Sequence, residues 1–327
     1  MPIQSPPEPL NTDGKPRRVG VELEFAGLLP EETAVIAQSL FGGTIEPLSA
    51  HRIKLRDTRW GDFSIELDSR YVHPESQPDV PNDSEWQRLR LKLDRRYREL
   101  LGDVVTGVVP TEIVCPPIDW ERLDELDILF NELRRYGAKG TDASLLYGFG
   151  LHLNPELPAL DSATILRYLR AWLLCANGIR EQIRVDITRE VLPHANPFPQ
   201  KYCLKVLDPA YRPDLETLVN DYLSDNDTRN RDLDLLPLFA HLCPNHSHPL
   251  LRKGLVQARP TFHYRLPNAQ LSDPEWGVVR EWNRWLEVET LACTPDTLAE
   301  RMAEYRARHA RSGWWQKLRS LLPGGRH

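Results

Sequence analysis

The 327-residue sequence predicts an α+β fold in which helices pack on the apolar face of an antiparallel sheet. The first observation is that five strand-like segments alternate apolar and polar side chains, as strands do when only one face of a sheet is covered. The second is that helical segments with a single apolar stripe are interleaved with these strands. The sequence shows neither an internal repeat nor a change of composition before about residue 290. We therefore expect one domain, of the size of a catalytic domain, to cover most of the chain.

The predicted strands are recognised by alternation and by their β-branched and aromatic residues. They cover residues 19–25, 53–58, 62–68, 104–115, 148–154 and 259–266. Pro110 interrupts the fourth segment, and Pro155 bounds the fifth.

The first predicted helix, residues 31–40, ends at the glycine pair that begins at Gly42. The later helices are recognised by apolar residues three or four positions apart, by a capping residue, or by proline at the first helical position. They are a helix capped by Ser84, one that contains Leu123 to Leu133, one from Asp161 or Ser162 through Ile179, and two that begin at Pro213 and Pro274. Trp276, Trp282 and Trp285 are expected in the core.

The two ends of the chain differ from its body. Residues 1–16 are rich in proline and polar groups and are expected to form a flexible or draped arm. Residues 294–327 are predicted to be a helical basic tail, and residues 301–327 carry a formal charge of +6, which leaves −12 on the rest. Residues 312–322 combine an apolar stripe with basic side chains, a pattern that fits an anionic membrane surface, a protein partner or packing on the chain's own domain.

Composition excludes several classes of protein. The acidic body has no basic stripe, which argues against nucleic acid as the main ligand. No apolar run approaches the roughly 20 residues of a membrane span, and the start lacks a signal peptide, so we expect a cytoplasmic protein. The five cysteines lie 28 to 60 residues apart without a CxxC pair, and we expect them to be reduced.

The polar residues of the alternating strands are the candidate functional groups. The first strand places Glu22 and Glu24 on its polar face, whereas the last places Arg259, His263 and Arg265 there. A solvated sheet face would explain the alternation of any single strand. The separation of acids and arginines onto different strands indicates instead a site for a metal ion and an anionic substrate.

Glu22 and Glu24 share a face at a spacing of about 7 Å, so they repel each other unless a cation lies near them. Carboxylate oxygens of this kind suit Mg²⁺ or Mn²⁺. Arg259 and Arg265 would offer bidentate donors to phosphate or carboxylate oxygens. Because the sequence has neither a phosphate-binding loop nor a dinucleotide fingerprint, any ATP must be held by metal and sheet residues.

Five segments, taken in order, resemble the amidoligase family, whose relatives include glutamine synthetase and glutamate–cysteine ligase. They are VGVELEF, DFS, EIVCPP, GFGLHLN and RPTFHYRL, and the resemblance covers residues 17–290. The resemblance implies a catalytic domain over residues 17–293 with a curved antiparallel sheet like that of glutamine synthetase. It also implies an ATP- and metal-dependent ligase that joins a small-molecule or peptide carboxylate to an amine through an acyl phosphate.

The resemblance also implies roles for individual residues. The expected metal ligands, with Mg²⁺ or Mn²⁺, are Glu22, Glu24, Asp62, Glu112, His152 and His263. The expected ATP contacts are His152, Arg259 and Arg265, and the expected catalytic residues are Glu22, Glu112, Arg259 and Arg265. Either Glu112 or Glu66 would accept the proton of the incoming amine.

His263 departs from the family pattern, which more often has a carboxylate at that place. Histidine binds Mg²⁺ poorly and Mn²⁺ or Zn²⁺ better. Either the metal preference differs or His263 is not a ligand.

Three further segments are weaker candidates. Lys201 and the polar run 226–234, with Arg229 and Arg231, belong to loops that could contact an anionic substrate or the nucleotide, although most such runs are solvated loops. A loop rich in potential zinc ligands, at His241, Cys243, His246 and His248, matches no known zinc spacing.

Two other functions remain open on the sequence. A metal-dependent hydrolase would use the same carboxylates and histidines to activate water. A non-catalytic interaction protein would retain the sheet and act through its basic tail.

Overall fold

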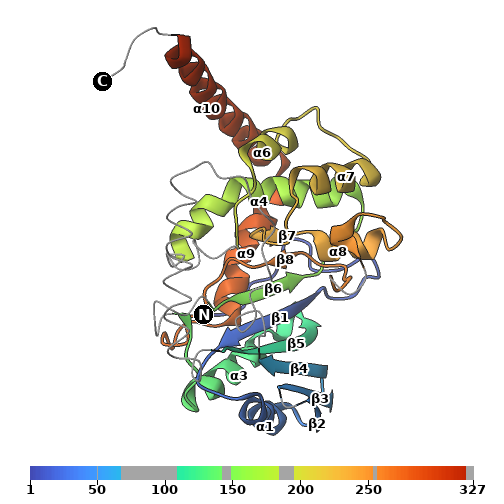
Figure 1. Cartoon of the computed structure of the whole chain (residues 1–327), viewed down its shortest axis with the longest axis vertical. Coiled ribbons are helices and arrows are strands. Elements are labelled where there is room, and N and C mark those ends of the chain that lie inside the picture. Colours follow the sequence, from blue (N-terminus) through green and yellow to red (C-terminus); the bar gives the residue numbers. More distant parts are fainter. Residues whose placement is uncertain (50, 68–108, 142–148, 184–194, 253–255, 322–327) are drawn as a thin grey trace.

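The computed structural model of the protein describes residues 1–49, 51–67, 109–141, 149–183, 195–252 and 256–321. Within these residues, eight strands form one open antiparallel sheet in the order β2-β3-β4-β5-β1-β6-β8-β7 (Figure 1). The strands are β1 (Arg18–Phe25), β2 (Thr44–Ser49), β3 (Arg52–Thr58), β4 (Gly61–Leu67), β5 (Thr111–Asp119), β6 (Leu151–Pro155), β7 (Leu233–Asp234) and β8 (His263–Tyr264). The predicted α+β class and antiparallel sheet are confirmed.

The helices are α1 (Pro30–Phe41), α3 (Asp124–Arg135), α4 (Ser162–Ile183), α6 (Gln200–Val206), α7 (Leu215–Asp225), α8 (Leu236–Leu242), α9 (Val278–Ala292) and α10 (Pro295–Leu321), with short 3₁₀ turns η2 (Trp120–Arg122) and η4 (Pro249–Leu251). Helices α1, α4 and α9 pack against the apolar face of the sheet, and further helices surround them. Helix α1 packs on β2, β3 and β4, and α4 packs on α9. None of the helices in the described part of the chain has the length and apolar character needed to cross a membrane.

Aromatic pairs join the helices to the sheet. Phe41 of α1 stacks on Phe63 of β4, with ring centroids 5.4 Å apart. Trp172 of α4 and Trp285 of α9 each lie 5.3 Å from the ring of Tyr264 in β8. Such pairs add roughly 1 kcal/mol each beyond the free energy of burying their apolar area. The apolar side chains that the alternation pattern predicted therefore face a layer of helices.

Strand β5 differs from its prediction. It begins at Thr111, continues through Pro116 and ends at Asp119, and residues 104–108 of the predicted segment lie outside the described residues. Val21 lies opposite Cys115 whereas Val19 lies opposite Ile118, so β5 has one extra residue at this point. This bulge accommodates two successive prolines, which lack the N–H needed to continue the ladder.

The segment 259–266 is a regular strand only at His263–Tyr264. Pro260 has no N–H, and the N–H groups of Arg259 and Arg265 bond to the carbonyls of Pro237 and Asp232. The alternation still holds, because Phe262, Tyr264 and Leu266 are in the core. The prediction of a long strand was wrong, but its division into two faces was right.

Two predicted helix starts were also displaced. Asp214 caps α7, which begins at Leu215 instead of Pro213. Pro274 lies in a turn, and α9 begins at Val278, where the carboxylate of Asp127 accepts the backbone N–H at 2.5 Å. The helix predicted after Ser84 lies outside the described residues.

The N-terminal arm lies against α9. The N–H of Gln4 donates to Asn283 at 3.0 Å, and the indole of Trp282 donates to the carbonyl of Gln4 at 3.0 Å. Directly after the arm, the fully buried Arg17 forms an ion pair with Glu289 of α9. The other carboxylate oxygen of Glu289 accepts the indole N–H of Trp285 at 2.7 Å. This network fixes the start of β1 to the helix layer.

Replacing Glu289 by glutamine removes the negative partner of a buried guanidinium. Because an unpaired buried charge is costly, we expect the free energy of unfolding to fall by about 3 kcal/mol. Urea titration monitored by circular dichroism measures this change. The exposed Glu287 lies two positions away on the same helix, and Glu287→Gln is expected to change stability by less than about 0.5 kcal/mol. Equal effects of the two substitutions would contradict the role given to the buried pair.

Candidate metal and nucleotide site

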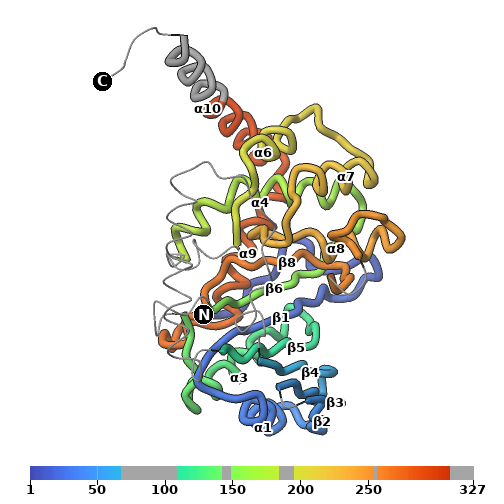
Figure 2. The backbone as a smooth tube through the Cα atoms, viewed as in Figure 1, coloured from blue at the N-terminus to red at the C-terminus, as the bar shows by residue number. Residues whose placement is uncertain are grey.

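Acidic side chains form a row across the polar face of the sheet. Glu24 of β1 lies opposite Glu112 of β5, which lies opposite Glu66 of β4, which in turn lies opposite Arg52 of β3. Residues directly opposite each other on neighbouring strands share a face, so the row follows from strand register alone. The next row along the sheet contains Glu22 and His152, which are opposite each other on β1 and β6. These two strands are distant in sequence and run side by side (Figure 2).

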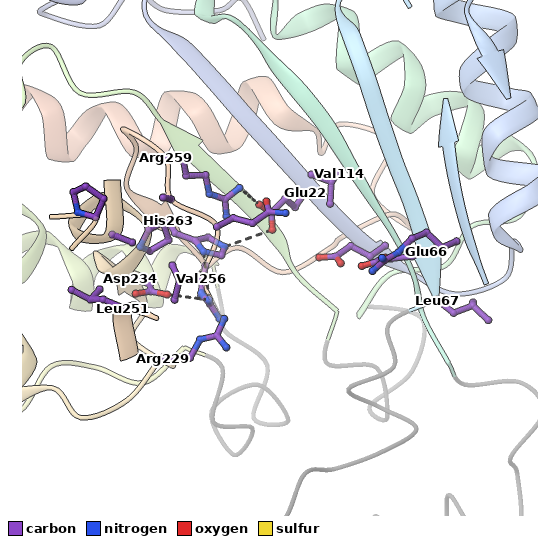
Figure 3. Close-up of a pocket in the computed structure, with 18 of the residues that line it drawn as sticks. Glu22, Glu66, Leu67, Val114, Arg229, Asp234, Leu251, Val256, Arg259 and His263 are labelled. Carbon is purple, nitrogen blue, oxygen red and sulfur yellow. Dashed lines mark hydrogen bonds and ion pairs between the residues drawn. The ribbon is translucent and has the colours of Figure 1, made fainter. Parts of the chain in front are cut away.

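A cavity of about 1230 Å³ opens over this face. We call it cavity 1. Glu22, Glu66 and Glu112 line it from the sheet, and Arg259, His263 and Arg265 line it from the segment that contains β8 (Figure 3). The structure therefore brings the acids of the first strand and the basic residues of the last one together around one space.

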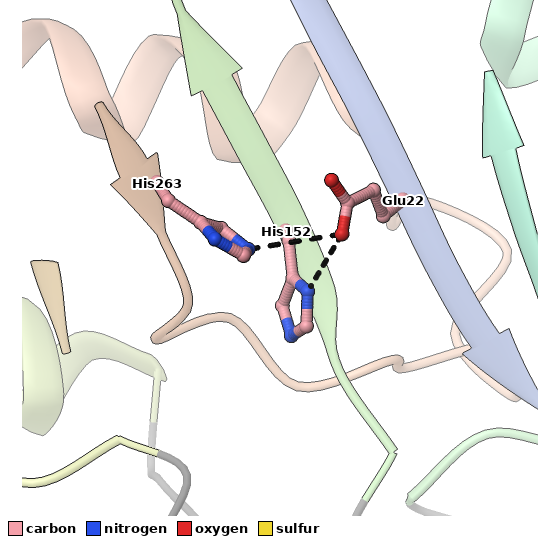
Figure 4. A group of neighbouring side chains, drawn as sticks. All are labelled: Glu22, His152 and His263. Atoms are coloured by element: carbon pink, nitrogen blue, oxygen red, sulfur yellow. Dashed lines mark hydrogen bonds and ion pairs between the residues drawn. The ribbon is translucent and has the colours of Figure 1, made fainter. Parts of the chain in front are cut away.

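The carboxylate of Glu22 lies next to four polar side chains. Its Oε1 accepts from Arg259 at 2.8 Å and from the side-chain amide of Asn154 at 2.9 Å. Its Oε2 lies 3.4 Å from Nδ1 of His152 and 3.7 Å from Nε2 of His263 (Figure 4). Burial opposes ionisation of Glu22, but the hydrogen bond to His152 and the positive charge of Arg259 hold its pKa well below its usual value. Glu22 is thus a carboxylate available to a cation.

Gly20 gives Asn154 the room to reach Glu22. A Cβ atom at position 20 would lie 3.3 Å from the Cβ of Asn154, a contact tighter than ordinary packing allows. The glycine therefore lets the side chain of Asn154 stand directly beside β1, where it donates to the carboxylate.

Two groups of side chains have the composition of metal sites. Glu22, His152 and His263 form one, and Glu24, Glu112 and His152 form the other, with the potential ligand atoms of each group within 4.8 Å of one another. All five side chains are buried, and His152 belongs to both groups. The carboxylate-rich group suits Mg²⁺ or Mn²⁺, and the histidines favour Mn²⁺ over Mg²⁺. Each group is therefore compatible with a divalent cation.

His263 is held in the neutral form. Burial and the nearby Arg265 lower the pKa of His263 well below its usual value. Its Nδ1 lies 3.4 Å from the guanidinium of Arg265, and an arginine can only donate, so the imidazole proton belongs on Nε2, which faces Glu22. In this tautomer the N–H of Nε2 is directed to Glu22, but at 3.7 Å from Oε2 it does not form a hydrogen bond with the carboxylate. Metal ligation through Nε2 would require the proton to move to Nδ1 and Arg265 to turn away.

Asp234 is a site residue that the sequence did not single out. It belongs to β7, lines cavity 1, and its carboxylate lies 3.1 Å from the guanidinium of Arg265. Burial raises the pKa of Asp234 above its usual value, although Arg265 opposes this effect. Arg229 of the same polar run also lines cavity 1, whereas Arg231 donates to the carbonyl of Pro197. A two-residue strand is too short to show alternation, so no sequence signal marks Asp234.

One wall of cavity 1 is apolar. Its side chains are Pro237 and Ala240 of α8, Pro244, Leu251 and Val256. Because this wall lies across from the charged residues of the sheet face, cavity 1 can bind a ligand with an apolar end and an anionic end.

Two predicted site residues, Asp62 and Lys201, do not line cavity 1. Asp62 accepts a hydrogen bond from Arg56 at 2.7 Å and does not belong to either metal group of the described residues. Lys201 is on α6, with a side chain that is 91% exposed and 3.8 Å from Asp225. In the histidine-rich loop, Nε2 of His246 lies 3.1 Å from the side-chain oxygen of Asn220, and no metal group of the described residues includes this loop.

The sheet, the buried acids and the facing arginines are compatible with a site for a divalent metal ion and an anionic ligand. Comparison with known protein families identifies the family of this chain. Residues 15–287 match the family described as "Putative amidoligase enzyme", so the chain belongs to the amidoligase family. No curated protein and no solved structure matches the chain significantly.

Replacing Glu24 by glutamine tests the metal site. Glutamine keeps an oxygen that can accept the N–H of Gly150, as Glu24 does at 3.0 Å, but removes the charge. We expect Mn²⁺ affinity, measured by isothermal titration calorimetry, to fall at least tenfold, because a hard cation is held chiefly by carboxylates. The exposed Glu275 is outside both metal groups, and Glu275→Gln controls for net charge. Unchanged Mn²⁺ binding by Glu24→Gln would contradict the assignment.

Proposed function

We propose that the protein is an ATP- and divalent-metal-dependent ligase that joins a carboxylate to an amine through an acyl phosphate. The observation that carries this proposal is the pair of buried metal-ligand groups that share His152: three of their five side chains, Glu22, Glu112 and His263, line cavity 1 together with Arg259 and Arg265. Family membership supports the ligase class. The open antiparallel sheet with a polar face supports a catalytic domain of the glutamine synthetase type.

Cavity 1 has complementary surfaces for the parts of a nucleotide. The apolar wall formed by α8, Leu251 and Val256 suits the base, and Arg229, Arg259 and Arg265 suit the phosphates. Divalent cations held by Glu22, Glu24, Glu112 and His152 would neutralise phosphate charge during transfer. A volume of about 1230 Å³ lies above the roughly 300–1,000 Å³ of ligand pockets, so a second substrate would have room beside the nucleotide.

Arg259 would have one role before a cation binds at Glu22 and another role afterwards. In the structure its guanidinium neutralises Glu22 at 2.8 Å. A cation bound at Glu22 would take over that neutralisation and release the guanidinium to bind a phosphate oxygen. The side chain is 25% exposed, so it has space to move into cavity 1.

The reaction would proceed in two steps. A substrate carboxylate oxygen attacks the γ-phosphorus of ATP, the bond from phosphorus to the bridging oxygen breaks, and ADP leaves. The amine nitrogen then attacks the acyl carbon, inorganic phosphate leaves with the electron pair of the C–O bond, and the amine loses a proton. Glu112 and Glu66 line cavity 1 and are the candidate proton acceptors. Because phosphoryl transfer depends on positioning and charge neutralisation, no nucleophilic serine or cysteine is needed.

Coupled release of ADP tests the proposed reaction. We expect the wild-type protein to release ADP from ATP only when Mn²⁺ or Mg²⁺, a carboxylic acid and an amine are all present, with pools of acids and amines as substrates. Glu22→Gln should lower this rate at least 100-fold, because it removes a charge needed for metal binding. Glu275→Gln should leave the rate unchanged. Metal-dependent consumption of a substrate without ATP would support a hydrolase instead.

A further inference from the structure

Asp234 is an acidic side chain in the basic part of cavity 1. The guanidinium groups of Arg229, Arg259 and Arg265 are close enough to act electrostatically on its carboxylate. Asp234 and Arg229 lie across cavity 1 from Glu66 (Figure 3). Because a carboxylate repels phosphate, binding of phosphates by the three arginines does not by itself account for an acid among them.

The two carboxylate oxygens of Asp234 have different partners. Oδ2 accepts from the guanidinium of Arg265 at 3.1 Å, and Oδ1 accepts the backbone N–H of Leu236 at 2.9 Å. Leu236 is the first residue of α8, and Pro237 and Ala240 of that helix belong to the apolar wall. One carboxylate therefore joins an arginine proposed to bind phosphate to the helix proposed to contact the base.

The pair of Asp234 and Arg265 is buried. Leu233 and Leu235, on either side of Asp234, are in the core, and β7 pairs with β8 so that Asp234 lies opposite His263. The position of Asp234 is therefore fixed by the sheet and the core. A guanidinium has five N–H donors, so Arg265 can bind an anion in cavity 1 while it stays paired with Asp234.

We propose that Asp234 is a positioning residue of the nucleotide site, which directs the guanidinium of Arg265 to the phosphates and fixes its distance from the apolar wall of α8. Asp234 belongs to neither metal group of the described residues, so we expect it to affect nucleotide affinity and not cation affinity. This inference rests on the proposed ligase function, because Asp234 acts through Arg265 within that site.

Replacing Asp234 by asparagine tests the positioning role. Asparagine keeps an oxygen for the N–H of Leu236 but cannot form an ion pair with Arg265. Calorimetric titration of the full chain with ADP at saturating Mn²⁺ should show at least tenfold weaker binding, whereas the affinity for Mn²⁺ alone should change less than twofold. The direction is informative, because loss of a negative charge near the phosphates would by itself strengthen ADP binding.

A double-mutant cycle connects the effect to the guanidinium. If Asp234 acts through Arg265, Asp234→Asn should change ADP affinity less than twofold in a protein that already carries Arg265→Met. Thermal unfolding of each variant establishes that it is folded at the temperature of the titration.

Asp232→Asn is the matched control for destabilisation. Asp232 is a buried acid two positions from Asp234, its carboxylate pairs with Arg180 at 2.8 Å, and it does not line cavity 1. This variant should lower the temperature of unfolding but change ADP affinity less than twofold, because its side chain does not contact Arg265.

A crystal of the wild-type protein with ADP and Mn²⁺ decides the question if Asp234→Asn does not fold. Arg265 should then contact a phosphate oxygen while it remains paired with Asp234.

Four results would overturn the inference. Asp234→Asn binds ADP as tightly as wild type or more tightly, its effect persists beside Arg265→Met, Asp232→Asn weakens ADP binding equally, or the crystal shows Arg265 away from the phosphates.

Titration with pyrophosphate in the absence of metal separates this inference from the proposed function. If wild type binds neither Mn²⁺ nor ADP, but binds pyrophosphate in a manner that depends on both Asp234 and Arg265, the ligase proposal fails and the positioning of Arg265 for an anion stands. If wild type binds neither ADP nor pyrophosphate, both fail.

Discussion

Burial of several carboxylates on one sheet face is the constraint on which the rest of the structure depends. Glu22, Glu24 and Glu112 are each less than 10% exposed, and β1 and β5 place them in adjacent rows. Like charges this close, away from bulk water, are stable as anions only when positive groups or donors surround them. Arg259, Asn154 and His152 provide this for Glu22. Under the proposed function, a metal ion would replace the guanidinium of Arg259 as the positive partner of Glu22.

The opposite face of β1 explains how these acids are held in place. Val21 and Leu23 alternate with the glutamates and are fully buried against the helix layer. The strand begins next to Arg17, whose buried pair with Glu289 joins it to α9. Because a slip of one residue would exchange the two faces, the core and the ion pair together fix which side chains point into cavity 1. Stability and site geometry are therefore specified by the same strand.

The sequence predicted the parts of this structure that depend on local pattern. Period-two alternation was enough to place Glu22, Glu24 and His152 on one face, and to separate Arg265 from Tyr264. It could not predict features that depend on tertiary contacts between distant segments, such as Asp234 opposite Arg265 or the apolar wall from α8. Asp62 lies on the predicted polar face, but its strand, β4, is two strands from β1. Its carboxylate is bound by the neighbouring Arg56. The prediction of a long strand at 259–266 was wrong because Pro260 has no N–H and the N–H of Arg259 bonds to the carbonyl of Pro237 in α8.

The central claim is that the buried acids of the sheet hold divalent cations which replace Arg259 at Glu22. Anomalous diffraction from a crystal of the protein with Mn²⁺ and ADP tests it most directly. The account predicts two Mn²⁺ ions about 4 Å apart. One should be bound by Glu24, Glu112 and His152, and the other by Glu22, with the guanidinium of Arg259 moved from Glu22 to a phosphate oxygen. Manganese bound away from these side chains, or an intact pair of Glu22 and Arg259 in the presence of both ligands, would contradict it.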